Sequence, residues 1–287
     1  MTLKAPFIWF GSKRTVVDDV WQRFGTPKQY LEPFCGSAAI LLGAPTPASL
    51  EVVGDLNGFL ANFWRAVKHQ PDKVAEWADY PVSHIDLGAR HRWLMEQRDR
   101  LGAELHDPNW LGDPKVAGWW LWGQCSWIGS GWCDWFGQIP HVSGPGRGSY
   151  DHLLTTGGKA AWVALHQLAA RLDRVRIIHG EWTRCLNHYY GAEQTAVFLD
   201  PPYLAFEGLY GTGGTPVATA VCEWAREHAH LRVALCGHAG DYDLPGWEVM
   251  PWSRSSNTYG SDKTKDAECI WFSPACLAPT KQLDLGL

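Results

Sequence analysis

Short apolar runs that alternate with helical patterns constrain the fold of this chain more than any other feature. Each of four runs is followed by a turn or a glycine-rich stretch, and then by apolar residues at three- and four-residue intervals. These runs occupy residues 29–32, 50–54, 175–179 and 196–200. Strands that are joined by helices in this way form a mainly parallel sheet. We therefore predict an α/β fold.

Further apolar runs complete the predicted sheet and place its helices. The later runs occupy residues 232–236, 247–252 and 268–272. No helix-length segment separates the last two, so we expect them to be antiparallel. Apolar residues recur at helical spacing in four stretches. These predicted helices occupy residues 38–42, 59–68, 159–172 and 217–230.

The alternation breaks between residues 70 and 159, where the sequence becomes rich in Trp, Gly, His and Pro. We interpret this stretch as an insertion. The chain holds 18 tryptophans, and many of them lie in residues 118–136. Such an excess indicates either a strongly aromatic core or surfaces that stack on planar ligands.

Composition narrows the class of protein. No apolar run approaches the roughly 20 residues that a membrane-spanning helix needs, so we expect a soluble protein without membrane contact. Residues 1–13 lack the order of a signal peptide, which predicts a cytoplasmic location. The eight cysteines form no C-x-x-C pair and are expected to be reduced core residues. A zinc site of Cys125, Cys133 and His141 matches no familiar spacing, so no metal is predicted.

The strongest chemical signal is the tetrapeptide Asp200, Pro201, Pro202 and Tyr203, directly after an apolar run. A strand delivers such a turn to the carboxyl edge of the sheet, where ligands bind in open α/β folds. An amine on an aromatic ring is a poor nucleophile because its lone pair is delocalised. A carboxylate and a proline carbonyl that accept its hydrogens localise that pair, while an aromatic side chain stacks on the ring. The alternative is a proline-stiffened turn with a capping Asp.

Two further elements indicate a nucleoside site. Small residues follow the first run at 32–38, and Asp55 and Asn57 follow the second, about 20 residues further on. A small-residue turn lets the backbone approach a nucleoside, and an acidic residue at that distance can bind both ribose hydroxyls. For either element alone, a tight turn or a helix cap is an equally good interpretation.

Taken in order along the chain, these motifs resemble the Dam-like DNA adenine-N6 methyltransferase family. The matching segments are 7–13, 32–42, 55–57, 180–182, 200–203, 233–236 and 268–271. The resemblance implies a Rossmann-like methyltransferase sheet, with catalytic parts at 1–69 and 171–287 and a target-recognition insert at 70–170. It also implies methyl transfer from S-adenosylmethionine to the N6 amino group of adenine in DNA.

The resemblance assigns roles to individual residues. Trp9 and Lys13 would contact the cofactor, Asp55 would hold its ribose, and Asp200 would lie between cofactor and amine. The full cofactor-binding set is Trp9, Phe10, Gly11, Lys13, Glu32, Phe34, Gly36, Ser37, Asp55, Asn57, Glu181, Trp182 and Asp200. Two positions depart from the family pattern, which usually has glycine in place of Ala38 and aspartate in place of Glu181.

The insert would then recognise double-stranded DNA from which the target adenine is flipped out of the stack, as DNA methyltransferases do with their target bases. Candidate DNA contacts are Tyr203, Trp127, Trp132, Trp135 and Arg147. For the tryptophans, a hydrophobic core of the insert is the alternative. The net charge of -5 counts against nucleic-acid binding, although a local basic groove can coexist with an acidic remainder. We expect a monomer, with a dimer on DNA as the alternative.

Three other functions stay open. The same chemistry could act on cytosine, RNA or a protein glutamine, although Asp at position 200 favours adenine by family analogy. A non-catalytic DNA-binding module would share the fold, and a small-molecule methyltransferase would leave the Trp-rich insert unexplained. The sequence leaves open the DNA sequence recognised, the presence of a partner restriction nuclease, and host or phage origin.

Overall fold

A central seven-stranded sheet organises the part of the chain that the computed structural model describes. That part comprises residues 2–7, 9, 11–80, 83–126, 132–133, 159–187, 194–203, 217–252 and 268–278. The strands are β1 (Gln29–Glu32), β2 (Leu50–Asp55), β3 (Val175–His179), β4 (Thr195–Leu199), β5 (Arg232–His238), β6 (Glu248–Trp252) and β7 (Glu268–Phe272). Each predicted run is confirmed, with ends that differ by at most two residues.

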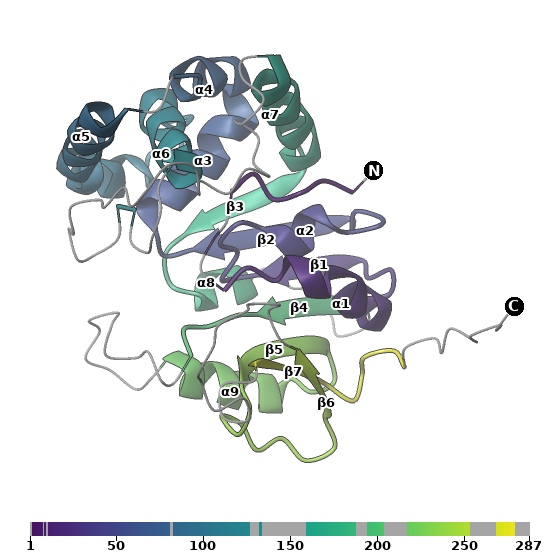
Figure 1. Cartoon of the computed structure of the whole chain (residues 1–287). Helices are drawn as coiled ribbons and strands as arrows, with labels where there is room; N and C mark the ends of the chain where they lie inside the picture. The colour runs from purple at the N-terminus through teal and green to yellow at the C-terminus, as the bar shows by residue number, and fades with distance from the viewer. Residues whose placement is uncertain are drawn as a thin grey trace, which may run out of the picture.

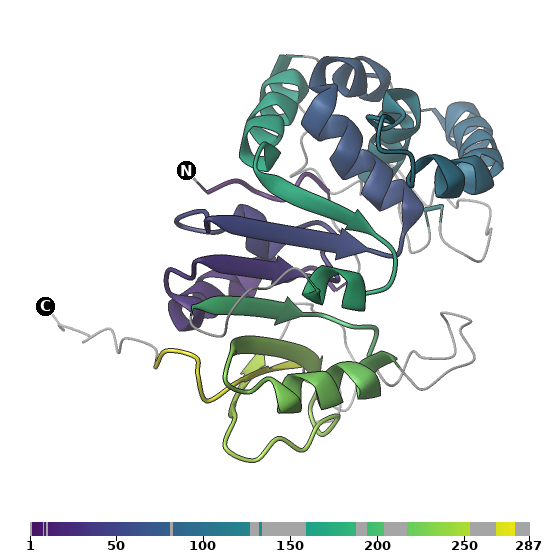
Figure 2. The same cartoon turned by 180° about the vertical axis from the view of Figure 1, so that it is seen from behind.

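The sheet is mainly parallel, as predicted. Its strand order is β3-β2-β1-β4-β5-β7-β6, and strands β1 to β5 pair in parallel. Strand β7 runs antiparallel to both β5 and β6, which confirms the expected antiparallel finish. The strand order reverses between β1 and β4, so a crevice is expected outside their carboxyl ends. Figure 2 shows the arrowheads of β1 to β4 at one common edge.

Helices cover the sheet and extend beyond its β3 edge (Figures 1 and 2). They are the 3-10 helix η1 (Arg14–Val16) and α1 (Val17–Phe24), α2 (Ala39–Leu42), α3 (Gly58–His69), α4 (Pro71–Ala78), α5 (His84–Glu104), α6 (Pro114–Ser126), α7 (Lys159–Leu172), α8 (Thr183–Leu186) and α9 (Val217–Glu227). The four predicted helices correspond to α2, α3, α7 and α9. None of the helices in the described residues combines the length and apolar character that crossing a bilayer requires.

The central strands are apolar because both of their faces are covered. Every residue of β4 is buried, as expected for a parallel strand between two helical layers. Glu51 is a charged exception on β2, with a side chain that is 3% exposed. Arg171 of α7 donates to both of its carboxylate oxygens, at 2.5 and 2.7 Å. This paired charge anchors α7 to the sheet.

Helix α6 carries part of the Trp-rich sequence into the core. It packs against α3 and α4, and its Trp120 and Trp122 are at most 1% exposed. The ring of Trp120 lies 5.0 Å from that of Phe7 and 5.6 Å from that of Phe63. Helices α4, α5 and α6 therefore share one hydrophobic cluster with the N-terminal segment and α3. At these positions the aromatic-core interpretation of the tryptophans holds.

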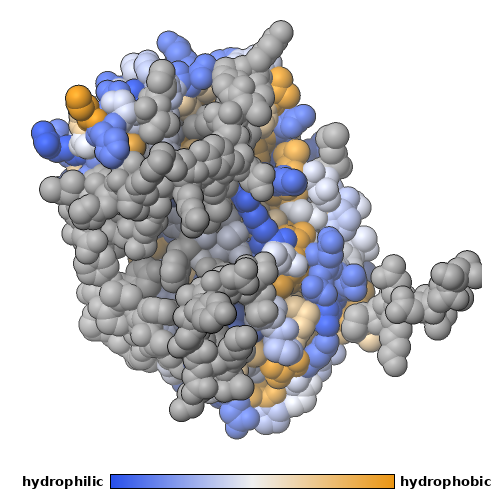
Figure 3. Space-filling view, viewed as in Figure 1, coloured by the Kyte–Doolittle hydropathy of each residue, from blue (hydrophilic) through white to orange (hydrophobic). Residues whose placement is uncertain are grey.

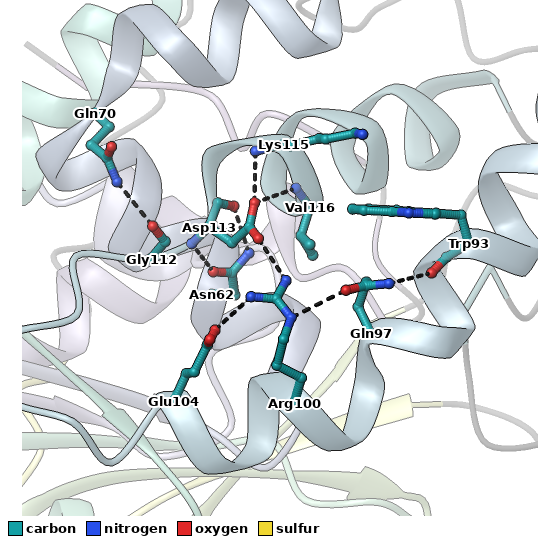
Figure 4. A network of polar contacts seen from close by, with 10 residues as sticks. All are labelled: Asn62, Gln70, Trp93, Gln97, Arg100, Glu104, Gly112, Asp113, Lys115 and Val116. Atoms are coloured by element: carbon teal, nitrogen blue, oxygen red, sulfur yellow. Dashed lines mark hydrogen bonds and ion pairs between the residues drawn. The ribbon is translucent and has the colours of Figure 1, made fainter.

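A polar network fastens α6 to α3 and α5 (Figure 4). Asn62 of α3 is fully buried, and its amide group bonds both the backbone carbonyl and the backbone N–H of Asp113, at 3.1 and 2.7 Å. The Asp113 carboxylate accepts the backbone N–H groups of Lys115 and Val116, and so caps the start of α6. Arg100 of α5 donates to the other carboxylate oxygen at 2.6 Å.

Cations lie among other aromatic side chains of residues 70–126. The Lys115 ammonium lies 4.4 to 5.0 Å from the ring centroids of Trp77, Trp93 and Trp119. The Arg90 guanidinium lies 4.2 Å from the ring centroid of Trp122 and is largely buried. Cation–π contacts of this kind stabilise most when the cation is removed from water.

Candidate functional site

Asp200 follows β4 directly and is paired with a buried lysine. The Lys13 ammonium lies 2.9 Å from Oδ2 of Asp200, and it also donates to the Gly11 carbonyl at 2.7 Å. The Lys13 side chain is 3% exposed. Burial lowers the pKa of Lys13, but the neighbouring carboxylates, Asp200 foremost, more than offset this effect and raise that pKa above its usual value. Lys13 is therefore a fixed positive charge beside Asp200.

Tyr203 lies at the same place, three residues beyond Asp200. Its hydroxyl donates to Oε2 of Glu268 at 2.9 Å. Its ring meets that of His238 edge to face with 4.6 Å between the centroids, and the Lys13 ammonium lies 5.4 Å from the ring centroid. Between Asp200 and Tyr203, Pro201 is buried and Pro202 is half-buried, and two fixed φ angles stiffen the turn.

The turn after β1 lies at the same edge of the sheet, because β1 is the parallel neighbour of β4. Gly36 has a φ of 46°, and a Cβ atom there would lie 2.5 Å from the Trp9 ring. The indole N–H of Trp64 donates to the Gly36 carbonyl at 3.1 Å. Trp9 therefore packs directly on a backbone that only glycine can provide. Ala38, where the family usually has a second glycine, also has a left-handed φ of 51°, and Ser37 beside it is buried.

Asp55, the last residue of β2, connects this turn to the next one. Its Oδ2 accepts the backbone N–H of Gly36 at 3.1 Å, and its Oδ1 accepts that of Asn57 at 2.9 Å. Burial raises the pKa of Asp55 to about 6, although these backbone N–H groups act in the opposite direction. The Asn57 side chain accepts the backbone N–H of Leu60 at 3.1 Å and so caps α3.

Glu32 takes a different place from the one expected. Its side chain is buried in the core, where Oε2 accepts the Tyr30 hydroxyl at 2.9 Å and the backbone N–H of Leu41 at 3.2 Å. Burial raises the pKa of Glu32 to about 8. The carboxyl group thus supports the β1 turn and α2 from inside, and we do not propose it as a ligand contact.

The segment after β3 presents an aromatic and an acidic residue. Trp182 is half-buried and is stacked on Phe34, with 6.3 Å between ring centroids and 23° between ring planes. Glu181 is exposed beside it.

A cavity of about 190 Å³ also lies at the ends of β2 and β3, lined among others by Leu56, Asn57 and His179. Neither Asp200 nor Tyr203 belongs to its lining.

Trp132 does not take the expected place at a DNA surface. It is 5% exposed, its indole N–H donates to the Trp120 carbonyl at 3.1 Å, and its ring covers Gly123 of α6. It is a core side chain because Gly123 leaves room for the large ring. Four other predicted site residues, namely Phe10, Trp127, Trp135 and Arg147, lie outside the described residues.

Sequence reasoning assigned no role to Glu268, the first residue of β7. Besides accepting the Tyr203 hydroxyl, its Oε2 lies 3.6 Å from the Lys13 ammonium. The sequence signals at this position were the family-like segment 268–271 and the predicted strand that begins there. The register of β7, which brings Glu268 opposite His238 at the end of β5, is seen only in the structure.

Carboxylates outnumber cations among the charged side chains beside Asp200. Two carboxylates, Asp200 and Glu268, face the ammonium of Lys13, and these three groups together leave one net negative charge. The glycine turn and Asp55 fit a nucleoside. The described residues hold no group of three or more His, Cys, Asp or Glu side chains arranged to bind a metal ion.

Comparison with known families agrees with this geometry. Residues 9–84 match the model of the D12 class N6 adenine-specific DNA methyltransferase family. This match confirms the predicted family resemblance over the part of the chain that it covers, which includes β1, β2, α3 and Asp55. The D12 match supports DNA adenine methylation as the general activity, whereas Asp200 and Tyr203 lie outside the matched residues. No curated protein matches the chain.

Proposed function

We propose that this chain transfers a methyl group from S-adenosylmethionine to the exocyclic N6 amino group of adenine in double-stranded DNA. The observation that carries the proposal is the position of Asp200, which follows the end of β4 beside Lys13 and Tyr203, next to the point where the strand order reverses between β1 and β4. The D12 match over residues 9–84, which include the turns after β1 and β2, supports the same conclusion.

Asp200 and its neighbours have the chemistry that a ring-bound amine requires. The Asp200 carboxylate and the Pro201 carbonyl would each accept a hydrogen from the amine, which localises the lone pair on nitrogen. Tyr203 would stack on the base and fix its orientation. After the new N–C bond forms, the amine is positively charged and acidic, so its surplus proton leaves to water without a strong general base.

The cofactor half of the site would be formed by residues of the N-terminal segment and of the β1, β2 and β3 turns. A carboxylate offers about four acceptor positions, so Asp55 keeps capacity for ribose hydroxyls beyond the backbone N–H groups that it accepts. Trp9 and Gly36 would line the nucleoside, and Glu181 and Trp182 would lie near its adenine, with Phe34 stacked behind Trp182. When bound, S-adenosylmethionine would supply an electrophilic methyl group on a sulfonium.

The insert would recognise the DNA. Chemistry on a base inside a duplex requires that base to leave the stack. Trp127, Trp135 and Arg147 stay our candidates for contacts with the DNA, whereas buried Trp132 is not proposed for that role. Figure 3 shows hydrophilic residues interspersed with apolar ones over the helical layer that holds α5. The exposed side chain of Arg92 on α5 fits a contact with a phosphate.

The proposal is tested by incubating purified protein with methyl-labelled S-adenosylmethionine and unmethylated duplex DNA, followed by digestion to nucleosides. We expect the label in N6-methyl-deoxyadenosine. Label in N4-methyl-deoxycytidine, or label only when RNA or protein replaces DNA, would point to the corresponding alternative substrate. No transfer to any of these, with the cofactor bound, would favour a non-catalytic DNA-binding module.

Replacing Asp200 with alanine tests its assigned role. We expect Asp200→Ala to lower the rate of transfer by at least about a hundredfold, the loss typical for removing one key electrostatic group. Cofactor binding, measured by calorimetry, should stay detectable. Asp243→Ala provides a matched control, because Asp243 is an exposed aspartate outside the site. Full activity of the Asp200 variant would remove Asp200 from the mechanism.

A further inference from the structure

Glu268 is an acidic residue of the site that the proposed chemistry does not use. Its Oε2 accepts the Tyr203 hydroxyl at 2.9 Å and lies 3.6 Å from the Lys13 ammonium. The side chain is 17% exposed, so it lies well within the site. One carboxylate oxygen thus contacts both the aromatic residue and the cation that surround Asp200.

We propose that Glu268 is a positioning residue, which orients the Tyr203 ring for stacking on the target base and shares the Lys13 ammonium with Asp200. This inference rests on the proposed function, and it assigns Glu268 no contact with the substrate.

The sheet gives Glu268 a rigid base for this role. Strand β7 lies between β5 and β6, and its register places Glu268 opposite His238 of β5 and Trp252 of β6. His238 also packs against the Tyr203 ring, 4.6 Å from centroid to centroid. Tyr203 is therefore held by a hydrogen bond at its hydroxyl end and by a ring contact along its body, both of which originate from the β5–β7 pair.

The direction of the hydrogen bond is fixed. Burial, with the charges of Asp200 and Glu268 among the further causes, raises the pKa of Tyr203 far above its usual value. The tyrosine thus stays protonated throughout the working pH range, and its hydroxyl donates the hydrogen bond to Glu268. An amide in place of the Glu268 carboxylate would still accept this bond through its oxygen, whereas a methyl group would not.

The same carboxylate affects the charge balance around Lys13. The ammonium bonds Asp200 at 2.9 Å and approaches Glu268 at 3.6 Å. It also lies 5.3 Å from the ring centroid of Trp252. When Asp200 accepts a hydrogen from the amine, Glu268 is the neighbouring carboxylate that can take a larger share of the Lys13 charge. Replacing Glu268 by a neutral residue should therefore strengthen the ion pair between Lys13 and Asp200.

The experiment compares Glu268→Ala and Glu268→Gln with wild type, using the DNA sequence that wild type is found to methylate. A duplex with 2-aminopurine at the target position reports stacking, because stacking on an aromatic ring quenches its fluorescence. For Glu268→Ala we expect kcat to fall about tenfold or more with cofactor affinity within about twofold of wild type. We also expect the fluorescence of the bound 2-aminopurine to rise, because the ring no longer has a fixed orientation.

Glu268→Gln separates the two parts of the role. It should restore the quenched 2-aminopurine signal through its amide oxygen, while kcat recovers only in part because the negative charge is missing. Glu248→Gln is the matched control, since Glu248 is the first residue of the neighbouring strand β6 and is paired with Arg23 outside the site. It should change neither signal.

Three results would overturn the inference while wild type methylates DNA. The first is an unchanged kcat and fluorescence in Glu268→Ala. The second is a loss of activity that matches a loss of folded protein in the same variant. The third is a Glu268→Gln variant no better than Glu268→Ala in fluorescence. If wild type itself transfers no methyl group to DNA, the proposed function fails, and this outcome is distinct from the other three.

Discussion

Acidic side chains lie at the ends of several strands, and Asp55 shows how burial shifts the pH at which such a group becomes charged. Its carboxylate lies at the end of β2 and accepts two backbone N–H groups, yet its pKa is raised to about 6. Near neutral pH it is ionised and can accept ribose hydroxyls. At lower pH it is protonated and loses acceptor capacity.

We therefore expect the affinity for S-adenosylmethionine to fall as the pH drops below about 6. The ionised fraction decreases up to about tenfold for each pH unit below the pKa, and affinity should follow it. Calorimetric titrations from about pH 5 to about pH 7.5 measure this change. Asp55→Asn should bind weakly at every pH, without that slope. A wild-type affinity that is independent of pH would contradict the role of Asp55.

Short motifs at strand ends were predictable from sequence, but their partners were not. Asp200 and Asp55 could be placed because a turn that follows a parallel strand reaches a known edge of the sheet. Glu268 could not, because it is 65 residues from Tyr203 and only the register of β7 joins them. Glu32 occupies a motif position, but the sequence does not reveal that its carboxyl group points into the core.

Among the helices, α6 shows why apolar periodicity did not predict the helices between residues 70 and 159. A helix can be recognised in a sequence by its apolar stripe only if its other face is exposed to water. The consecutive residues Trp120, Leu121 and Trp122 point in different directions around α6, and all are buried. The strands were easier, because an apolar run bounded by turns is the expected pattern for a strand with both faces covered. Helix α5 was missed for the opposite reason, since few of its positions are buried.

Because α6 packs closely on α4, replacing a glycine by alanine should have opposite effects on stability at two positions, Gly118 of α6 and Gly88 of α5. A Cβ atom at Gly118 would lie 2.8 Å from the Val74 carbonyl oxygen and 2.4 Å from the Cβ atom of Trp77, so Gly118→Ala should lower the free energy of unfolding by about 1–3 kcal/mol. At Gly88, in the interior of α5, no heavy atom other than those of its chain neighbours and of the surrounding helix backbone lies within 4 Å of such a Cβ. Gly88→Ala should raise the free energy of unfolding by about 0.5–1 kcal/mol.

Urea denaturation of the two variants and wild type, followed by circular dichroism, measures both changes. The Gly88 variant is the control for the general effect of alanine on a helix. Equal shifts in the two variants would mean that α4 and α6 do not approach each other as closely as the contacts at Gly118 indicate.

At the scale of the whole molecule, the insert helices and the sheet form one packed unit. Trp120 of α6, Phe63 of α3 and Phe7 of the N-terminal segment belong to the same hydrophobic cluster. Helix α3 begins next to Asn57, its capping residue, and bonds the start of α6 through Asn62. The Asp55–Asn57 turn and the start of α6 are therefore both fixed by α3.

This shared core predicts a single cooperative unfolding transition. Tryptophan fluorescence, which reports largely on the Trp-rich insert, and far-UV circular dichroism, which reports on all helices and strands, should give the same urea midpoint. Asn62→Ala should lower both midpoints together, with a loss of about 1–3 kcal/mol in unfolding free energy, because it leaves the backbone N–H of Asp113 without the acceptor that it has in the folded chain. The exposed Asn109→Ala should leave both unchanged.

Binding of the cofactor should stabilise the same unit as a whole. S-adenosylmethionine at about a hundredfold excess over its Kd should raise the free energy of unfolding by about 2.7 kcal/mol, because it binds only the folded chain. Both urea midpoints should therefore rise together. An earlier transition in fluorescence alone would mean that the insert unfolds separately. A cofactor effect on circular dichroism alone would mean that α3 does not couple the insert to the site.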